Sequence, residues 1–219
     1  AEAGLGRVNV SIDPLRRSRY RELTRRDRLD DALAGLTAAA AAGLSPVKVN
    51  AVAMRGVNDD EIVELVEFCV ARGYQMRFIE QMPLDAGHTW DRASMVTREE
   101  ILAALAARWS IAPVADDDPH APARLFTLDG GPATAGVIAS VSQPFCGTCD
   151  RVRLTADGQV RNCLFAREES DLRAVLRGGA DDAGVAAALV EALRGKKPGH
   201  GIDEPGFLQP ERPMSAIGG

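Results

Sequence analysis

Three cysteines near the end of the chain form the pattern most able to do chemistry. Cys146 and Cys149 form a CxxC pair, and Cys163 follows after thirteen further residues. A CxxC turn lets two thiolates converge on one centre, and Ala156-Asp157-Gly158 is typical of a hairpin turn that would return the third thiolate beside them. A structural zinc site closes with four protein ligands, whereas a [4Fe–4S] cluster held by three cysteines leaves one iron open to substrate.

Two other interpretations of the cysteines stay open at this point. One is a zinc ribbon, which would take its fourth ligand from one of the three histidines, His88, His120 or His200. The other is a redox-active CxxC pair, which is weakened because no thioredoxin-like helix pattern follows Cys149.

Two arginines follow the CxxC pair at a spacing of two residues. On a strand, Arg151 and Arg153 would point to one face, and Val152 and Leu154 to the other. Two guanidinium groups beside a metal centre suit a polyphosphate or a carboxylate. The alternative is a solvated strand that turns its arginines outward and its apolar residues inward.

Composition limits the class of protein. The chain has 219 residues, 46% of them hydrophobic, and a net charge of −5, which argues against binding nucleic acid or an anionic membrane through its overall field. No apolar run approaches the ~20 residues that span a bilayer, and no signal peptide is visible. Four cysteines without such a signal favour metal or redox chemistry over disulfides. We therefore expect a cytoplasmic protein, and a fragment, because the chain starts at Ala1 close to a buried-type strand.

The first half of the chain alternates strand and helix patterns. Strands are predicted at residues 7–13, 47–54 and 76–81, and helices at 27–43 and from about 58 to 73. This alternation is typical of parallel βαβ units, so we expect an α/β fold with part of a (β/α) barrel over residues 1–110. Cys69 has apolar neighbours at helical spacing, which assigns it to the core.

The second half has a different pattern, and we expect a separate α+β region over residues 111–219. Thr97 begins a capping box for a helix to about Trp109, and residues 111–134 are rich in Asp, Pro and Gly. Beyond them, short strands are predicted at 137–141, 151–155 and 159–165, and helices at 169–177 and 180–194.

Polar residues recur at period two on all three predicted barrel strands: Asn9, Ser11, Lys48, Asn50, Arg77 and Gln81. Strands buried on both faces are usually apolar throughout. Polar groups inside a barrel must be paired or contact a ligand. The pattern therefore favours a lined cavity over isolated, satisfied core groups.

These residues together resemble the radical S-adenosylmethionine (SAM) GTP 3′,8-cyclase family of molybdenum-cofactor biosynthesis. The most specific stretch runs from Phe145 to Leu154 and on through Arg161 to Phe165, and it is similar to the motif that holds the family's auxiliary [4Fe–4S] cluster at the guanine base. Further similar segments are residues 7–13, 47–50, 54–59 and 77–82, and the closing diglycine Gly218-Gly219.

The resemblance implies a set of roles. Cys146, Cys149 and Cys163 would ligate the auxiliary [4Fe–4S] cluster. GTP would be bound by Lys48, Arg151, Val152 and Arg153, and SAM by Ser11 and Met82. Catalysis would involve Arg77, Gly218 and Gly219.

The implied reaction is that of a lyase. A 5′-deoxyadenosyl radical would drive the cyclisation of GTP to (8S)-3′,8-cyclo-7,8-dihydroguanosine 5′-triphosphate, which a cyclic pyranopterin monophosphate synthase would consume. The family's N-terminal CxxxCxxC is absent, since no cysteine precedes Cys69. A second [4Fe–4S] cluster is therefore expected in a missing N-terminal part, and the chain alone is expected to be inactive. Asp150 stands where Asn is more often expected.

Two other functions remain as alternatives, namely another radical-SAM enzyme with an auxiliary cluster and a zinc-stabilised binding module. No nucleic-acid or membrane partner is expected. The sequence leaves the oligomeric state open, with a homodimer as one option.

Overall fold

The computed structural model describes residues 1–115 and 120–217, so Gly218 and Gly219 lie outside the described residues. The chain divides into two compact units. The first contains residues Ala1–Gln81 and Arg92–Gln143, and the second contains Met82–Asp91 and Pro144–Gly219.

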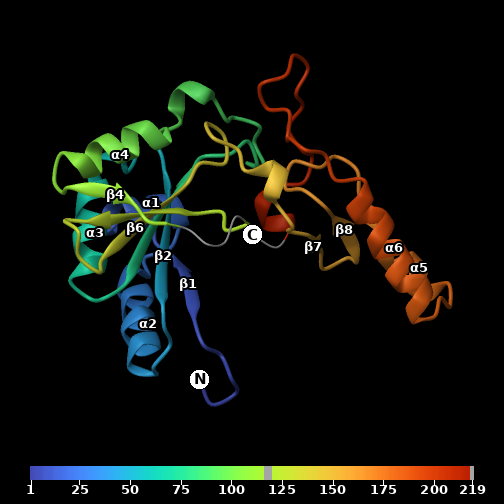
Figure 1. Ribbon diagram of the computed structural model, residues 1–219, viewed down its shortest axis with the longest axis horizontal. Coiled ribbons are helices and arrows are strands. Elements are labelled where there is room, and N and C mark those ends of the chain that lie inside the picture. Colours follow the sequence, from blue (N-terminus) through green and yellow to red (C-terminus); the bar gives the residue numbers. More distant parts are fainter. Residues whose placement is uncertain (116–119, 218–219) are drawn as a thin grey trace. The chain divides into compact units, whose positions relative to one another are not determined.

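A six-stranded sheet forms the centre of the first unit, in the order β1-β2-β3-β6-β5-β4 (Figure 1). The first four of these strands run parallel, and β5 and β4 add an antiparallel edge. The strands are β1 (Val8–Ser11), β2 (Val47–Ala53), β3 (Gln75–Glu80), β4 (Ile111–Pro113), β5 (Arg124–Leu128) and β6 (Thr134–Ile138). The α/β class with a parallel sheet is thereby confirmed.

Helices cover one face of this sheet, as the flank of α2, α3 and α4 in Figure 1 shows. The helices of the unit are α1 (Arg17–Thr24), α2 (Leu29–Ala41), α3 (Ile62–Val70) and α4 (Arg98–Ala106). The core between helices and sheet includes Leu36 of α2, Leu65 of α3, and Val49 and Phe78 of the strands. Cys69 is fully buried there, as predicted. The predicted capping box at Thr97 is also confirmed.

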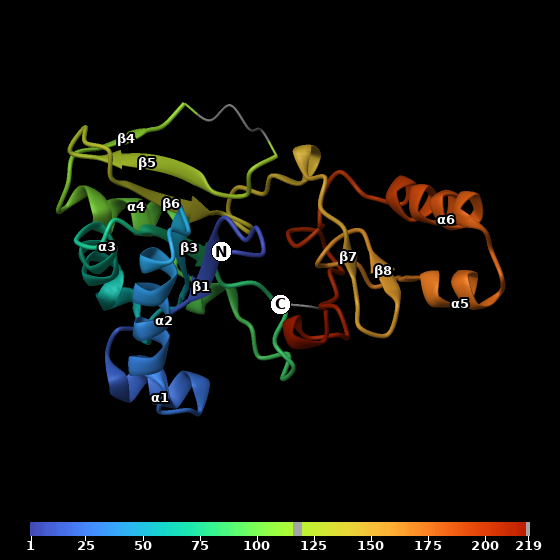
Figure 2. The ribbon, with the colours of Figure 1, turned by 90° about the horizontal axis from the view of Figure 1, so that it is seen from below.

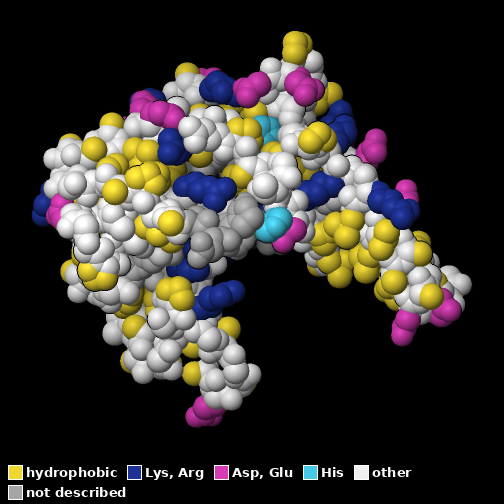
Figure 3. Space-filling view, viewed as in Figure 1, with side chains coloured by type: hydrophobic (Ala, Val, Ile, Leu, Met, Phe, Trp, Pro, Cys, Tyr) yellow, Lys and Arg dark blue, Asp and Glu magenta, His cyan; other side chains and the backbone are white. Residues whose placement is uncertain are grey.

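The second unit has a small antiparallel sheet and two helices, whose labels appear in Figure 2 as β7, β8, α5 and α6. The sheet contains β7 (Arg153–Leu154), β8 (Gln159–Arg161) and β9 (Ser170–Asp171), and the helices are α5 (Leu172–Arg177) and α6 (Asp182–Arg194). Val160, Leu172 and Ala192 form the small core between them. Figure 3 shows hydrophobic side chains gathered on one face of these elements. Leu176 and Val190 are among the exposed large apolar residues of the unit.

Three elements of the first unit were not predicted from the sequence. Helix α1 buries none of its residues, so it carries no apolar periodicity. Strands β4 and β5 lie in the stretch rich in Asp, Pro and Gly, where turn residues flank very short strands. No helix in the described part of the chain has the length and apolarity needed to cross a membrane.

Candidate functional site

Polar side chains form two rows across the face of the sheet opposite the helices. Lys48 and Asn50 alternate along β2 with fully buried neighbours, which is the predicted period of two. Strand register brings five of the predicted polar residues together in two rows: Asn9 and Lys48 in one, joined by Gln75, and Ser11, Asn50 and Arg77 in the other. The sixth, Gln81, follows the end of β3. The structure thus places Ser11, Lys48 and Arg77 on one surface.

This surface carries positive charge. Partial burial lowers the pKa of Lys48, and the nearby charges of Arg77 and Arg7 lower it further. Burial also lowers the pKa of Arg77, with Arg7 adding to the shift. The Arg77 Nε donates to Gln75 Oε1 at 3.2 Å, and the buried Asn50 Oδ1 has no hydrogen-bond partner among the described residues. A face with mutually repelling cations and an unpaired buried polar atom is suited to an anionic, hydrogen-bonding ligand.

A glycine makes room for Arg77. Gly136 of β6 lies directly opposite Arg77 of β3. A Cβ at this position would lie 3.2 Å from Arg77 Cγ and 3.0 Å from Leu125 Cδ2. A side chain here would therefore displace the stem of Arg77 from its present course.

Glu80 fixes the segments at the end of β3. Its carboxylate is fully buried and accepts backbone hydrogen bonds from Arg98 at 2.8 Å, Val141 at 2.9 Å and Ser142 at 2.8 Å. The Ser142 hydroxyl donates to it as well. One carboxylate thus joins the start of α4 to the segment after β6.

The three clustered cysteines, Cys146, Cys149 and Cys163, lie in the second unit, on one turn and one hairpin. Cys146 and Cys149 are at the two ends of a 3-10 turn, in which the Cys149 N–H donates to the Cys146 carbonyl at 3.2 Å. Strands β7 and β8 pair antiparallel, and Cys163 lies two residues after the end of β8. Burial raises the pKa of Cys146, and the negative charge of a Cys163 thiolate raises it further. A hydrogen bond from the His200 backbone acts in the opposite direction. The three thiols are therefore within electrostatic range of one another.

Two cations lie beside these thiols. Burial would raise the pKa of Cys149, but hydrogen bonds from Arg151 and the charges of Arg151 and Lys196 together lower it. The Arg151 Nε donates to Cys149 Sγ at 3.4 Å, and its guanidinium lies 4.9 Å from the Phe145 ring centroid. Half-buried thiols with adjacent cations are favourable places for thiolates.

The three thiols are soft donors, of the kind that bind iron–sulfur clusters or zinc. Among the described residues, no three His, Cys, Asp or Glu side chains are placed to hold one metal ion. The nearby His200 accepts a hydrogen bond from Ile202 N on Nδ1, at 3.1 Å, and its ring lies 4.9 Å from that of Phe165. Cysteine thiolates are the usual ligands of iron–sulfur clusters.

The arginine pair is arranged differently from a regular strand. Only Arg153 and Leu154 belong to β7, and Arg151 and Val152 precede it. Leu154 is 61% exposed and Val152 is 42% exposed, whereas Arg153 is half-buried. The alternative in which the apolar residues point inward is therefore wrong.

Arg153 also lies near the end of the described chain. Its Nη1 donates to the Ile217 carbonyl at 3.4 Å, just before the diglycine that lies outside the described residues. Met82 belongs to the same unit as Arg153, whereas Ser11 belongs to the first unit.

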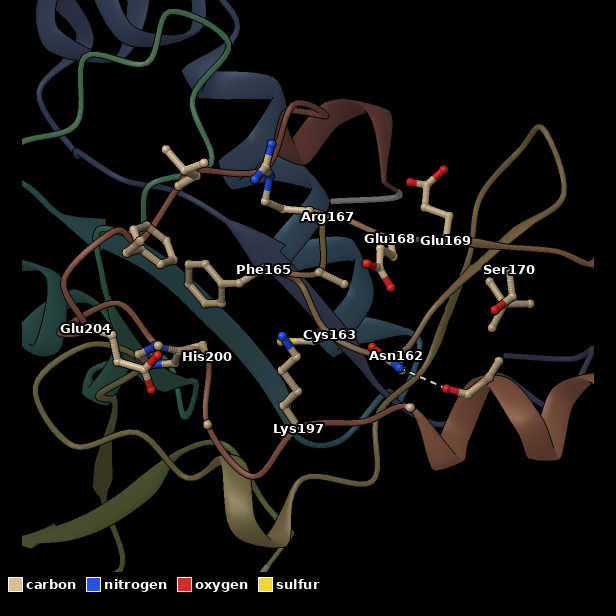
Figure 4. A pocket seen from close by; sticks show the side chains of 18 of the residues that line it. Asn162, Cys163, Phe165, Arg167, Glu168, Glu169, Ser170, Lys197, His200 and Glu204 are labelled. Carbon is tan, nitrogen blue, oxygen red and sulfur yellow. Dashed lines mark hydrogen bonds between the residues drawn. The ribbon is translucent and has the colours of Figure 1, made fainter.

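A cavity of about 500 Å³ opens beside Cys163 in the second unit. Figure 4 shows Phe165, Cys163 and Lys197 directed toward its middle, with His200 and Glu204 on one side. The sequence did not predict this cavity, because its residues come from the hairpin and from a tail without periodicity.

Lys196 is a further residue of the site that the sequence did not reveal. Its Nζ donates to the carbonyls of Arg151 and Asn162, at 2.8 and 2.6 Å. Contacts to carbonyls leave no mark in the sequence pattern, since every residue offers one.

Two family profiles match successive parts of the chain. The profile of the family described as Molybdenum Cofactor Synthesis C matches residues 74–202, and that of the Radical SAM superfamily matches residues 1–69. A GTP 3′,8-cyclase of Mycobacterium sp. (strain KMS) is 58% identical over 99% of this chain. A GTP 3′,8-cyclase 2 of Mycobacterium tuberculosis (strain ATCC 25618 / H37Rv) is 56% identical over the whole chain.

The chain spans 62% of the length of each of these relatives. The first profile covers more than half of the chain and includes all three cysteines of the turn and hairpin. This chain therefore belongs to the Molybdenum Cofactor Synthesis C family.

Proposed function

We propose that this chain is the substrate-binding portion of a radical SAM lyase that cyclises GTP in molybdenum-cofactor biosynthesis. The observation that carries the proposal is the group of three thiols, Cys146, Cys149 and Cys163, with Arg151 beside them. The similarity to proteins named GTP 3′,8-cyclase supports the same substrate.

The cofactors would supply the radical chemistry. When bound, SAM and its cleaving cluster would supply the 5′-deoxyadenosyl radical needed to exchange the ribose 3′ C–H bond of GTP for a bond to guanine C8. The residues of this chain hold and orient the substrate. The three cysteines would hold the auxiliary cluster, which would supply an iron able to bind the guanine base.

Cationic side chains would bind the triphosphate. Lys48 and Arg77 lie on the polar face of the sheet, and their mutual repulsion is relieved when an anion binds between them. Arg151 and Arg153 provide guanidinium groups on the second unit, which suit phosphate oxygens. Ser11 and Met82 are proposed for SAM, and Gly218 and Gly219 for the reacting end of the substrate.

The proposal also covers the downstream enzyme and the cellular compartment. The product would pass to a cyclic pyranopterin monophosphate synthase, and the protein would act in the reducing cytoplasm, where free thiols persist. The chain as given lacks cysteines for the SAM-cleaving cluster before Cys69, so we expect it to bind GTP without turning it over. A homodimer is the oligomeric state to test.

Titration of GTP into the chain with its cluster reconstituted tests this function. Arg153→Ala should weaken GTP binding by about 10- to 100-fold, since a hydrogen bond to a charged group contributes about 1.5–3 kcal/mol. The control is Arg108→Ala, which removes an arginine paired with Glu67 on an exposed surface. Equal GTP affinity in the two variants, or no binding by the wild type, would reject the proposal.

A further inference from the structure

The ammonium group of Lys196 bridges the two segments that carry the cysteines. It donates to the carbonyl of Arg151, two residues after Cys149, and to the carbonyl of Asn162, immediately before Cys163. These carbonyls lie 45 and 34 residues away from Lys196 in the sequence. One side chain thus joins the CxxC turn to the hairpin.

The end of α6 holds Lys196 in place for this contact. The Asn162 Nδ2 donates to the Ala192 carbonyl at 2.8 Å, so Asn162 and the end of α6 exchange two hydrogen bonds in opposite directions. The Lys196 N–H closes the helix on Leu193 O at 3.0 Å. A Cβ at Gly195 would lie 3.4 Å from Asn162 Nδ2, so the helix end and the hairpin are closely packed.

A second cation holds the other side of Cys163. The Arg161 side chain is almost fully buried, and its Nη2 donates to the carbonyls of Leu164 and Ala166. The carbonyls on both sides of Cys163 are therefore bound by cationic side chains, Lys196 before it and Arg161 after it. Such contacts fix the direction of the backbone and hence the position of the sulfur.

We propose that Lys196 is a positioning residue of the three-cysteine site. It sets the separation of Cys163 from the CxxC turn, and its positive charge lies against the thiolates. The inference rests on the proposed cluster. Groups outside the ligand shell of a metal orient the ligands and tune the centre, and nearby charge sets the reduction potential of an iron–sulfur cluster. A lost positive charge should make that potential more negative.

The experiment compares the wild-type chain with Lys196→Met, which keeps the length of the side chain and removes its charge and donors. The cluster is reconstituted without oxygen, and iron and sulfide content, reduction potential and the rate of iron loss to a chelator are measured. Lys196→Met should lose iron about tenfold faster and have a more negative potential. Lys196→Arg should restore both values. Arg194→Met is the control, since Arg194 is an exposed cation on α6 that pairs with Glu191.

The outcomes distinguish a failure of the cluster proposal from a failure of the Lys196 proposal. A wild type without iron and sulfide would reject the cluster and the role of Lys196 with it. A wild type with its cluster, and a Lys196→Met variant with the same potential and the same rate of iron loss, would reject the role of Lys196 alone. If Lys196→Met does not fold, Lys196→Gln replaces it under the same criteria, because its amide still donates but carries no charge.

Discussion

Replacing the buried carboxylate of Glu80 should loosen the backbone after β6. In Glu80→Gln, the single amide oxygen can still accept hydrogen bonds from Val141 and Ser142, which both donate to one carboxylate oxygen. The amide nitrogen then faces the Arg98 N–H, which donates to the other oxygen. Two donors would point at each other in a fully buried place.

The cost follows from these contacts. A buried donor without a partner costs about 1–3 kcal/mol, and the loss of charge weakens each remaining hydrogen bond by roughly half. We expect a total of about 2–4 kcal/mol. Since ~1.4 kcal/mol is a factor of ten, the segment should open roughly 30- to 700-fold more often.

Hydrogen exchange at the amides of Val141 and Ser142 measures this opening directly. Their protection should fall by that factor in Glu80→Gln. The matched control is Glu67→Gln, because Glu67 pairs with Arg108 where both side chains are about half exposed, and a surface pair contributes at most about 1 kcal/mol. Unchanged protection in Glu80→Gln would refute the reasoning.

Two further predictions concern the polar face and the thiols. Gly136→Ala should lower stability by about 1–2 kcal/mol and weaken GTP binding by displacing Arg77, whereas Gly131→Ala, whose Cβ meets only one atom at 3.4 Å, should do neither. Thermal denaturation and GTP titration of the two variants test this prediction. Equal effects of Gly136→Ala and Gly131→Ala on stability and GTP affinity would contradict it. In the metal-free chain, iodoacetamide should label Cys149 first, since its pKa is lowered, and Cys69 last, since burial raises its pKa to about 12. Mass spectrometry showing Cys69 labelled before Cys149 would contradict the assignment.

Local signals explain what the sequence could predict. The alternation along β2 shows directly in Lys48 and Asn50, because one face of the strand packs against helices. The capping box at Thr97 and the helical spacing around Cys69 are also properties of a few neighbouring residues.

Elements that depend on long-range contacts could not be predicted from the sequence. Helix α1 is anchored by Glu61, which accepts from the Leu15 and Arg16 amides and from the Arg19 side chain. These partners are more than forty residues apart, and no apolar pattern marks the helix. Strand β5 depends likewise on pairing with β6, which buries Phe126.

In the three-cysteine site, too, only the residues with a local sequence signal could be predicted. The cysteine spacing was visible because thiols are few, so that Cys146, Cys149 and Cys163 stand out. Lys196 was not visible, because its partners are carbonyls on two distant segments. The roles proposed for Ser11 and other residues of the polar face remain predictions.

The central claim is the iron–sulfur cluster held by three cysteines. Elemental analysis of the chain purified without oxygen tests it most directly. We predict about four iron and four acid-labile sulfide per chain, with little zinc. About one zinc per chain and no sulfide would contradict the account and favour a zinc-stabilised binding module.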